Sequence, residues 1–187
     1  MPHLVGAFTL IGLSGLLALL PNDWGQWLIY DRQAILDGQL WRLVTGHLMH
    51  TNGWHFAMNS AGVLVIAWLH GRYYRFGDWW LRLGYLALMT SLGLLVFSPE
   101  LYWYVGLSGV LHGLILMGAL EDIRCSEKTG WLILLGLAIK IGWEQWMGPS
   151  AEVVSLIGAP VATQAHLFGA LAALPYGLWA FRRKKGA

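Results

Sequence analysis

Runs of apolar residues separated by short polar connections extend over most of the chain, and they predict an all-α membrane protein. Each run covers about 13 to 20 residues, and the longer ones can cross a hydrocarbon core of about 30 Å as a helix. The runs lie at residues 4–20, 54–70, 79–97, 108–120, 130–147 and 162–181. We therefore expect a bundle of six transmembrane helices that forms a single domain over residues 1–187.

The segment before the fourth and shortest run is unusual. Residues 98–106 contain the consecutive aromatic side chains of Tyr102, Trp103 and Tyr104, and the apolar run begins soon after at Ser108. Non-helical backbone at membrane depth is tolerated only where protein or a wet cavity surrounds it. This segment is therefore predicted to be a re-entrant loop, followed by a helix that begins inside the membrane.

The basic residues predict how the bundle is oriented. Arg32 and Arg42 fall on one side of a six-span arrangement, and Lys140 lies inside or near the fifth span. The other nine fall on the opposite side: Arg72, Arg75, Arg82, Arg124, Lys128, Arg182, Arg183, Lys184 and Lys185. Cytoplasmic loops are enriched in Lys and Arg. Both termini are therefore expected in the cytoplasm, with the long Trp-rich connection at 21–53 in the outer interface.

The composition agrees with a membrane protein and narrows the chemistry. Apolar residues make up 57% of the chain and charged residues 12%, about half the charged fraction of a soluble domain. The single cysteine, Cys125, excludes an intramolecular disulfide and gives no thiolate framework for a metal. The N-terminus lacks a basic region and a small-residue cleavage site, so the first run is expected to be retained. No cofactor, metal or nucleic-acid partner is indicated.

Ser108 and His166 are the candidate nucleophile and base. In the six-span arrangement the second, fourth and sixth runs all enter the membrane from the outer side. Ser108 starts the fourth run and His166 lies one turn into the sixth, so both are expected at a similar depth. A serine hydroxyl needs an adjacent base to become a nucleophile, and polar groups at membrane depth are costly enough to mark a functional site. The pair therefore predicts acyl transfer.

The start of the second run supplies candidate oxyanion donors. His55 and Asn59 are four residues apart, so they share one helix face. A tetrahedral intermediate is stabilised by preorganised donors, and these two side chains with the Ser108 backbone N–H are expected to provide them. No Asp or Glu occurs in the second, fourth or sixth run above its cytoplasmic end. A Ser/His dyad is therefore predicted, while Lys140 and Glu144 are expected to pair with each other or to reach the interface.

Other histidines allow different interpretations. His47, His50 and His55 could suggest a metal site, but their spacing is loose and no Cys or carboxylate accompanies them, which favours a structural role in the outer loop. His112 and His166 could be axial haem ligands between two spans. That arrangement leaves the serine and the asparagine unexplained.

A second copy of the GLSG sequence lies at residues 12–15. It sits in the middle of the first run, with no loop before it and no histidine one turn later. Small residues are common at contacts between membrane helices. This copy is therefore assigned to packing, and only the copy at 106–109 is a candidate site.

Four motifs in order resemble those of the rhomboid intramembrane serine proteases. They are Trp41-Arg42 in the first outer loop, HLMHTNGWHFAMN at 47–59, GLSG at 106–109 and AHLFGALAA at 165–173. The resemblance implies a rhomboid-like bundle with Ser108 as nucleophile, His166 as base, and His55 and Asn59 as oxyanion donors. The residues expected to line the site are Gly106, Gly109, His112 and Gly169. The family commonly has an aromatic residue, often Tyr, one turn after the serine, and here His112 takes that position.

The compact form and the sequence GLSGVLHG most resemble the bacterial rhombosortase branch. That resemblance implies a protein of the bacterial inner membrane whose site opens toward the periplasm. Its substrates would be exported proteins with a C-terminal Gly-Gly motif, an apolar span and a basic tail, cleaved near these small residues. The competing class is an inactive rhomboid-like protein that binds or escorts membrane helices. Such a protein is expected to lack Ser108 or His166, and this chain has both.

Overall fold

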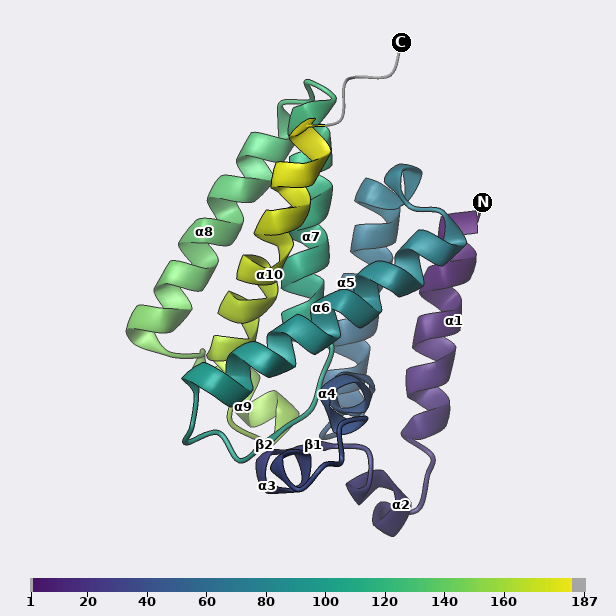
Figure 1. Ribbon diagram of the computed structural model, residues 1–187, viewed down its shortest axis with the longest axis vertical. Coiled ribbons are helices and arrows are strands. Elements are labelled where there is room, and N and C mark those ends of the chain that lie inside the picture. The colour runs from purple at the N-terminus through teal and green to yellow at the C-terminus, as the bar shows by residue number, and fades with distance from the viewer. Residues whose placement is uncertain (1, 183–187) are drawn as a thin grey trace.

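The computed structural model describes residues 2–182, and most of this chain is helical (Figure 1). Every predicted apolar run forms a long helix. These helices are α1 (Pro2–Leu17), α5 (Gly53–His70), α6 (Phe76–Phe97), α7 (Ser108–Arg124), α8 (Thr129–Met147) and α10 (Thr163–Arg182).

The long helices alternate in direction, so that α5, α7 and α10 all begin at the same end of the bundle (Figure 1). The short elements gather at that end, and the side chains at the start of these three helices therefore share one layer. Helix α1 begins and α10 ends at the opposite end (Figure 1). Of the predicted basic run at the C-terminus, Arg183, Lys184 and Lys185 lie outside the described residues.

Within the described residues, α6 alone combines the length and the apolar composition needed to cross a membrane, while the apolar stretch of α1, Leu4–Leu17, is shorter. The other long helices contain polar residues within their apolar faces, among them Asn59 on α5, Glu144 on α8 and His166 on α10. The helices that fall short of a simple hydropathy test thus include those that carry the candidate chemistry.

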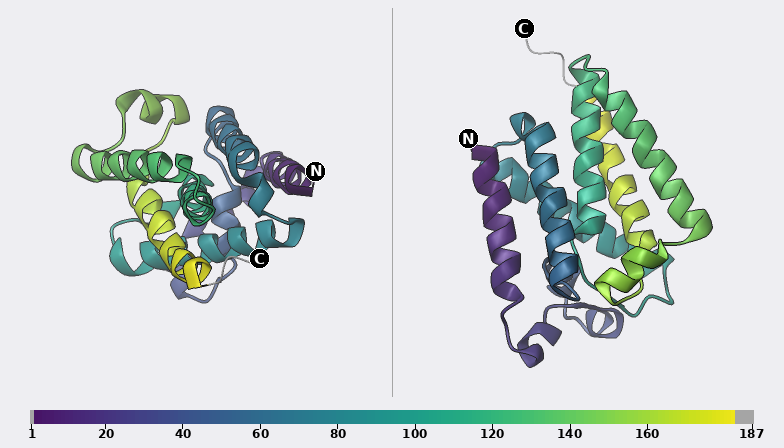
Figure 2. Two further views of the ribbon diagram at one scale, coloured as in Figure 1. Left: turned by 90° about the horizontal axis from the view of Figure 1, so that it is seen from above. Right: turned by 180° about the vertical axis from the view of Figure 1, so that it is seen from behind.

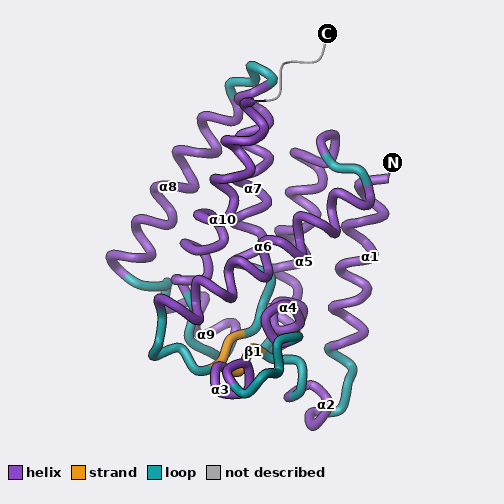
Figure 3. Tube along the Cα trace, in the orientation of Figure 1, coloured by secondary structure: helices purple, strands orange, loops and turns teal. Residues whose placement is uncertain are grey.

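Two short strands are an exception to the all-α prediction. Strands β1 (Tyr30–Asp31) and β2 (Trp103–Tyr104) pair antiparallel, with Tyr30 opposite Tyr104 (Figure 3). The outer connection also forms α2 (Asn22–Gln26), α3 (Arg32–Leu36), α4 (Arg42–Thr45) and the 3₁₀ turn η1 (Gly46–Leu48), and a second such turn, η2 (Gly71–Tyr73), joins α5 to α6. The strand pair ties this connection to the segment before Ser108, since an extended segment at that depth needs partners for its backbone.

Arg42 holds the outer connection together from inside. Its side chain is buried, and its guanidinium donates to the carbonyls of Gln26 at 2.7 Å and Ile29 at 2.9 Å and to the side chain of Gln39 at 2.8 Å. A planar guanidinium with five donors suits such a cluster of acceptors. The tryptophans of this connection, in contrast, are largely exposed: Trp24, Trp27 and Trp41.

Helix α7 ends at Arg124 rather than at residue 120 because its last turn is paired with neighbouring elements. Asp122 is buried and accepts hydrogen bonds from Tyr73 at 2.7 Å, Arg72 at 3.0 Å and Thr129 at 3.2 Å. A buried charge is tolerated only when it is paired and hydrogen-bonded. This cluster joins α7 to η2 and to the start of α8.

Helices α7 and α10 approach each other through glycine. A Cβ atom added to Gly169 would lie 1.9 Å from the carbonyl oxygen of Gly109, and one added to Gly109 would lie 2.7 Å from the carbonyl oxygen of Ala165. Side chains of any size would force the two backbones apart, so the glycines set the spacing between these helices.

Replacing Gly169 with Ala is expected to separate α7 from α10 and to destabilise the protein. The added methyl group must move by more than about 1 Å from the Gly109 carbonyl oxygen, and overpacking of this kind lowers the free energy of unfolding by about 1–3 kcal/mol. The measurement is the thermal unfolding midpoint in detergent. Gly84→Ala is the matched control, because a Cβ at Gly84 on α6 meets nothing within 4 Å; equal losses in both variants would contradict the prediction.

Candidate active site

Ser108 and His166 are in direct contact. The Ser108 side chain lies at the first residue of α7, and its Oγ is 2.9 Å from Nε2 of His166, near the start of α10. His166 is 5% exposed, so the hydrogen bond is shielded from solvent. A nucleophile within hydrogen-bond distance of a base is the arrangement that acyl transfer requires.

Gly106 brings the chain into the first turn of α7. Its φ angle is +116°, a region that residues with side chains rarely adopt. A Cβ at this position would lie 2.6 Å from the His55 ring, so the backbone passes directly over that histidine. The carbonyl of Gly106 accepts a 2.5 Å hydrogen bond from the Tyr104 hydroxyl, and its N–H donates to the carbonyl of Gly46. Both predicted glycines of the GLSG motif therefore have geometric reasons, one for the turn and one for the helix contact.

His166 has a second partner that the sequence interpretation did not include. Its Nδ1 lies 2.8 Å from Oε2 of Glu144 on α8. The prediction that no carboxylate accompanies the serine and histidine is therefore wrong. That prediction rested on the second, fourth and sixth runs, whereas Glu144 lies in the fifth. The expected Lys140–Glu144 pair is also present, with Nζ 2.7 Å from Oε1, so Glu144 contacts both side chains.

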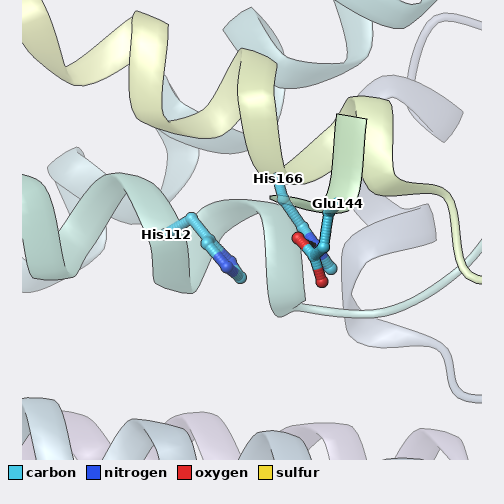
Figure 4. Close-up of side chains that lie close together, drawn as sticks. All are labelled: His112, Glu144 and His166. Atoms are coloured by element: carbon cyan, nitrogen blue, oxygen red, sulfur yellow. Dashed lines mark hydrogen bonds and ion pairs between the residues drawn. The ribbon is translucent and has the colours of Figure 1, made fainter. Parts of the chain in front are cut away.

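His112 stacks on the base. Its ring lies 4.1 Å from the His166 ring, centroid to centroid, at an interplanar angle of 11°. Its Nδ1–H donates a 2.7 Å hydrogen bond to the Ser108 carbonyl. Figure 4 shows His112, Glu144 and His166 reaching toward one another from α7, α8 and α10.

The stacking of His112 on His166 argues against both a metal site and a haem site at these residues. His112, Glu144 and His166 offer ligand atoms within 4.8 Å of one another. A metal ion binds imidazole nitrogen in the ring plane at about 2.0–2.1 Å. Two nearly parallel rings 4.1 Å apart cannot both have one ion in their planes. Axial haem ligands face each other across the porphyrin, and rings in direct contact leave no room for it. The hydrogen bonds and the ring stacking therefore account for the arrangement of these three residues.

The predicted oxyanion donors lie beside the serine. His55 and Asn59 on α5 are 8% and 5% exposed, and both line the same cavity as Ser108. Among the described residues, the Nδ2 of Asn59 is buried without a hydrogen-bond partner. A buried amide N–H without a partner costs free energy. Such an unpaired donor is expected where the amide is reserved for a ligand. The Ser108 backbone N–H lies in the first turn of α7, where such groups lack intrahelical partners.

The other outer histidines do not form a metal cluster with His55. His47 is fully buried and its Nε2 contacts Ser91 Oγ at 3.0 Å, while the His50 ring packs edge-on against the rings of His55 and Phe56. Burial lowers the pKa of both His47 and His50 to about 4. Both rings are therefore neutral at physiological pH and serve as packing groups beneath the outer connection.

Two cavities meet at Ser108. One of about 400 Å³ lies under the outer segments and is lined by Thr51, Trp103 and Gln164. The other, of about 610 Å³, lies between α5 and α8 and is lined by Met58, Trp143 and Glu144 among others. Helix α8 packs on α7 and α10 and diverges from the bundle toward its C-terminal end, where α9 (Ala151–Ile157) lies against α5 (Figure 2). The serine is thus reachable from the end of the bundle at which α5, α7 and α10 begin and from the side.

A known protein family matches most of this chain. The family model described as the rhomboid domain matches residues 37–183. The chain belongs to the rhomboid family. Membership makes it a membrane protein.

A curated relative agrees with this membership. The rhomboid chain is 25% identical over 140 residues to the Bacillus subtilis (strain 168) protein named "Putative rhomboid protease YdcA". The alignment covers 73% of this chain and 65% of that relative's length. About a third of the relative's length therefore has no counterpart in the alignment.

Glu144 is the residue near Ser108 in this rhomboid chain that sequence reasoning missed. Its i,i+4 spacing to Lys140 already supplies a partner, so the spacing indicates no further role. The position of Glu144 along its helix is the signal that could have identified it. Glu144 precedes the end of the fifth helix by three residues, which places it at the level where the fourth and sixth helices begin.

Proposed function

We propose that this rhomboid protein is an intramembrane serine endopeptidase in which Ser108 is the nucleophile and His166 the general base. The observation that carries the proposal is the 2.9 Å contact between Ser108 Oγ and His166 Nε2 in a buried layer. The whole chain, 1–187, would act as one six-span rhomboid-like domain. We place it in the bacterial inner membrane, with both termini in the cytoplasm and the site open to the periplasm.

The chemistry follows from the contacts. Ser108 Oγ attacks the carbonyl carbon of the scissile peptide as His166 Nε2 takes the hydroxyl proton. The C–N bond of the peptide then breaks, and His166 Nε2 delivers the proton to the leaving amine. Water loses a proton to His166 and attacks the acyl-enzyme, which releases the new carboxylate and restores the Ser108 hydroxyl. The outer cavity is the route for this water.

The oxyanion would be held by three donors. Asn59 Nδ2 is unpaired and buried, His55 lies under Gly106, and the Ser108 N–H opens α7. Donors that are already oriented stabilise the developing charge without reorganisation. Their convergence beside one hydroxyl supports a protease rather than a helix-binding protein.

The substrate would be a transmembrane protein that enters from the lipid bilayer through the cavity between α5 and α8. A membrane helix must unwind before its carbonyl can reach Ser108. Glycine weakens a helix by about 1 kcal/mol relative to Ala, so small residues near the cleavage site favour that step. From the resemblance of GLSGVLHG to the rhombosortase branch, we propose exported proteins with a C-terminal Gly-Gly motif, an apolar span and a basic tail.

A fluorophosphonate probe and a cleavage assay test the proposal together. The probe is expected to label the wild-type protein at Ser108, and a reporter with a Gly-Gly motif before its apolar span is expected to be cleaved. Ser108→Ala should abolish both signals. Ser14→Ala is the matched control and should retain both, because Ser14 is also a buried serine but lies on α1 and lines neither cavity at Ser108.

The competing function is a membrane-helix escort without catalysis. It predicts no probe labelling, and reporter processing that does not depend on Ser108. Cleavage that persists in Ser108→Ala would therefore overturn the proteolytic proposal. Cleavage of a reporter in which the two glycines are replaced by leucine would overturn only the proposed substrate class.

A further inference from the structure

We propose that Glu144 is a positioning residue for His166 and that Lys140 acts on the site through Glu144. The proposal rests on the proposed proteolytic function and extends it from two residues to a connected set. The set runs from Ser108 Oγ to His166 at 2.9 Å, from His166 to Glu144 at 2.8 Å, and from Glu144 to Lys140 at 2.7 Å.

Glu144 determines which tautomer of His166 is present. To accept the Ser108 proton, Nε2 must be unprotonated, and the ring proton must then reside on Nδ1. An ionised carboxylate only accepts hydrogen bonds. Glu144 Oε2 therefore selects the tautomer with the proton on Nδ1 and fixes the ring plane, as a carboxylate does for the histidine of other serine hydrolases.

Glu144 also offsets the positive charge that His166 acquires. When His166 takes the serine proton it becomes an imidazolium in a shielded layer, and the adjacent carboxylate offsets the new charge. The other titratable groups that face His166 are His112, stacked on its ring from α7, and His55 on α5. Neither of them can supply a negative charge. Glu144 is thus the group in this layer suited to stabilise the protonated base.

Lys140 stabilises the Glu144 carboxylate. The Glu144 side chain is 14% exposed, and an unpaired carboxylate at this depth would be strongly disfavoured. Lys140 binds the second oxygen, Oε1, from one helical turn away, and its own side chain is 49% exposed. This pairing keeps Glu144 ionised and leaves Oε2 free for His166. The long side chain reaches the carboxylate while its stem lines the cavity between α5 and α8.

The test compares Glu144→Gln, Glu144→Asp and Lys140→Gln in the full-length protein with the reporter assay. Glu144→Gln preserves size but can present an amide N–H to Nδ1, which favours the wrong tautomer. We expect kcat to fall by about 10²-fold or more with KM little changed. Glu144→Asp, which retains the charge, should recover at least about tenfold of that loss. Glu127→Gln is the matched control, because Glu127 is exposed near the opposite end of the bundle.

A double-mutant cycle tests the role of Lys140. Lys140→Gln alone is expected to lower kcat by about 3–10-fold, and to have no further effect when Glu144 is already Gln, since coupled residues are not additive. Equal activity of Glu144→Gln and wild type would overturn the inference while leaving the proposed function intact. Failure of Glu144→Asp to recover activity, or additive losses in the double variant, would also overturn it. Ser108→Ala tests the proteolytic function separately.

Discussion

His166→Ala is expected to lower kcat by about 10⁴-fold or more, while the protein remains folded. Without the imidazole, nothing accepts the Ser108 proton, and removal of the histidine in a serine protease costs about as much as removal of the whole catalytic set. The remaining oxyanion donors leave a residual rate of about 10³-fold over water. The measurement is single-turnover cleavage of the reporter, with gel filtration in detergent to verify the fold.

His112 provides the matched control for that variant. It is also a histidine, it stacks on His166 at 4.1 Å, and it lies in the same layer. His112→Phe retains a flat ring against the base and loses only the hydrogen bond to the Ser108 carbonyl. We expect a loss of no more than about tenfold, because a single net hydrogen bond contributes about 1 kcal/mol. Similar losses in the two variants would contradict the assignment of His166 as the base.

Asn59→Ala is expected to lower kcat by about 10²–10³-fold, the cost of removing one oxyanion donor. The amide N–H is unpaired in the resting site, so its removal breaks no hydrogen bond described for the folded protein. Stability should therefore change little, and KM should stay near the wild-type value because the donor acts mainly on the transition state. Steady-state cleavage and thermal unfolding measure the two effects.

Ser60→Ala is the control for Asn59. Ser60 follows it on α5 but lines neither of the two cavities at Ser108. Its replacement should leave kcat within about twofold of the wild-type value, the usual effect of a substitution away from such a site. A drop of less than about fivefold in Asn59→Ala would show that His55 and the Ser108 N–H stabilise the oxyanion without it.

Hydropathy and residue order predicted much of this molecule. Long apolar runs mark helices because each must bury its backbone hydrogen bonds within itself in lipid, and all six predicted runs are helical. The alternating direction of the six runs predicted that Ser108, His166, His55 and Asn59 lie in one layer. The structure brings these residues together. Family membership is established by the match over residues 37–183.

The remaining features depend on contacts that no local pattern encodes. Strands β1 and β2 are two residues each and lie more than seventy residues apart in the chain, too short and too distant for periodicity to indicate. Glu144 had a complete local explanation in Lys140, and only the packing of α8 on α10 brings its Oε2 to His166. A residue with two acceptor atoms can serve two partners, and sequence spacing identifies only the nearer one.

Ser108, Glu144 and His166 come from three different helices, and the contacts between these helices are not equally tight. Gly109 and Gly169 hold α7 against α10, so the Ser108–His166 contact belongs to a rigid pair. Glu144 belongs to α8, which borders the side cavity and diverges from the bundle. Any outward movement of α8 therefore lengthens the Glu144–His166 contact and leaves the serine and histidine in place. In the proposed mechanism, such a movement would separate the positioning carboxylate from the base without separating the base from the nucleophile.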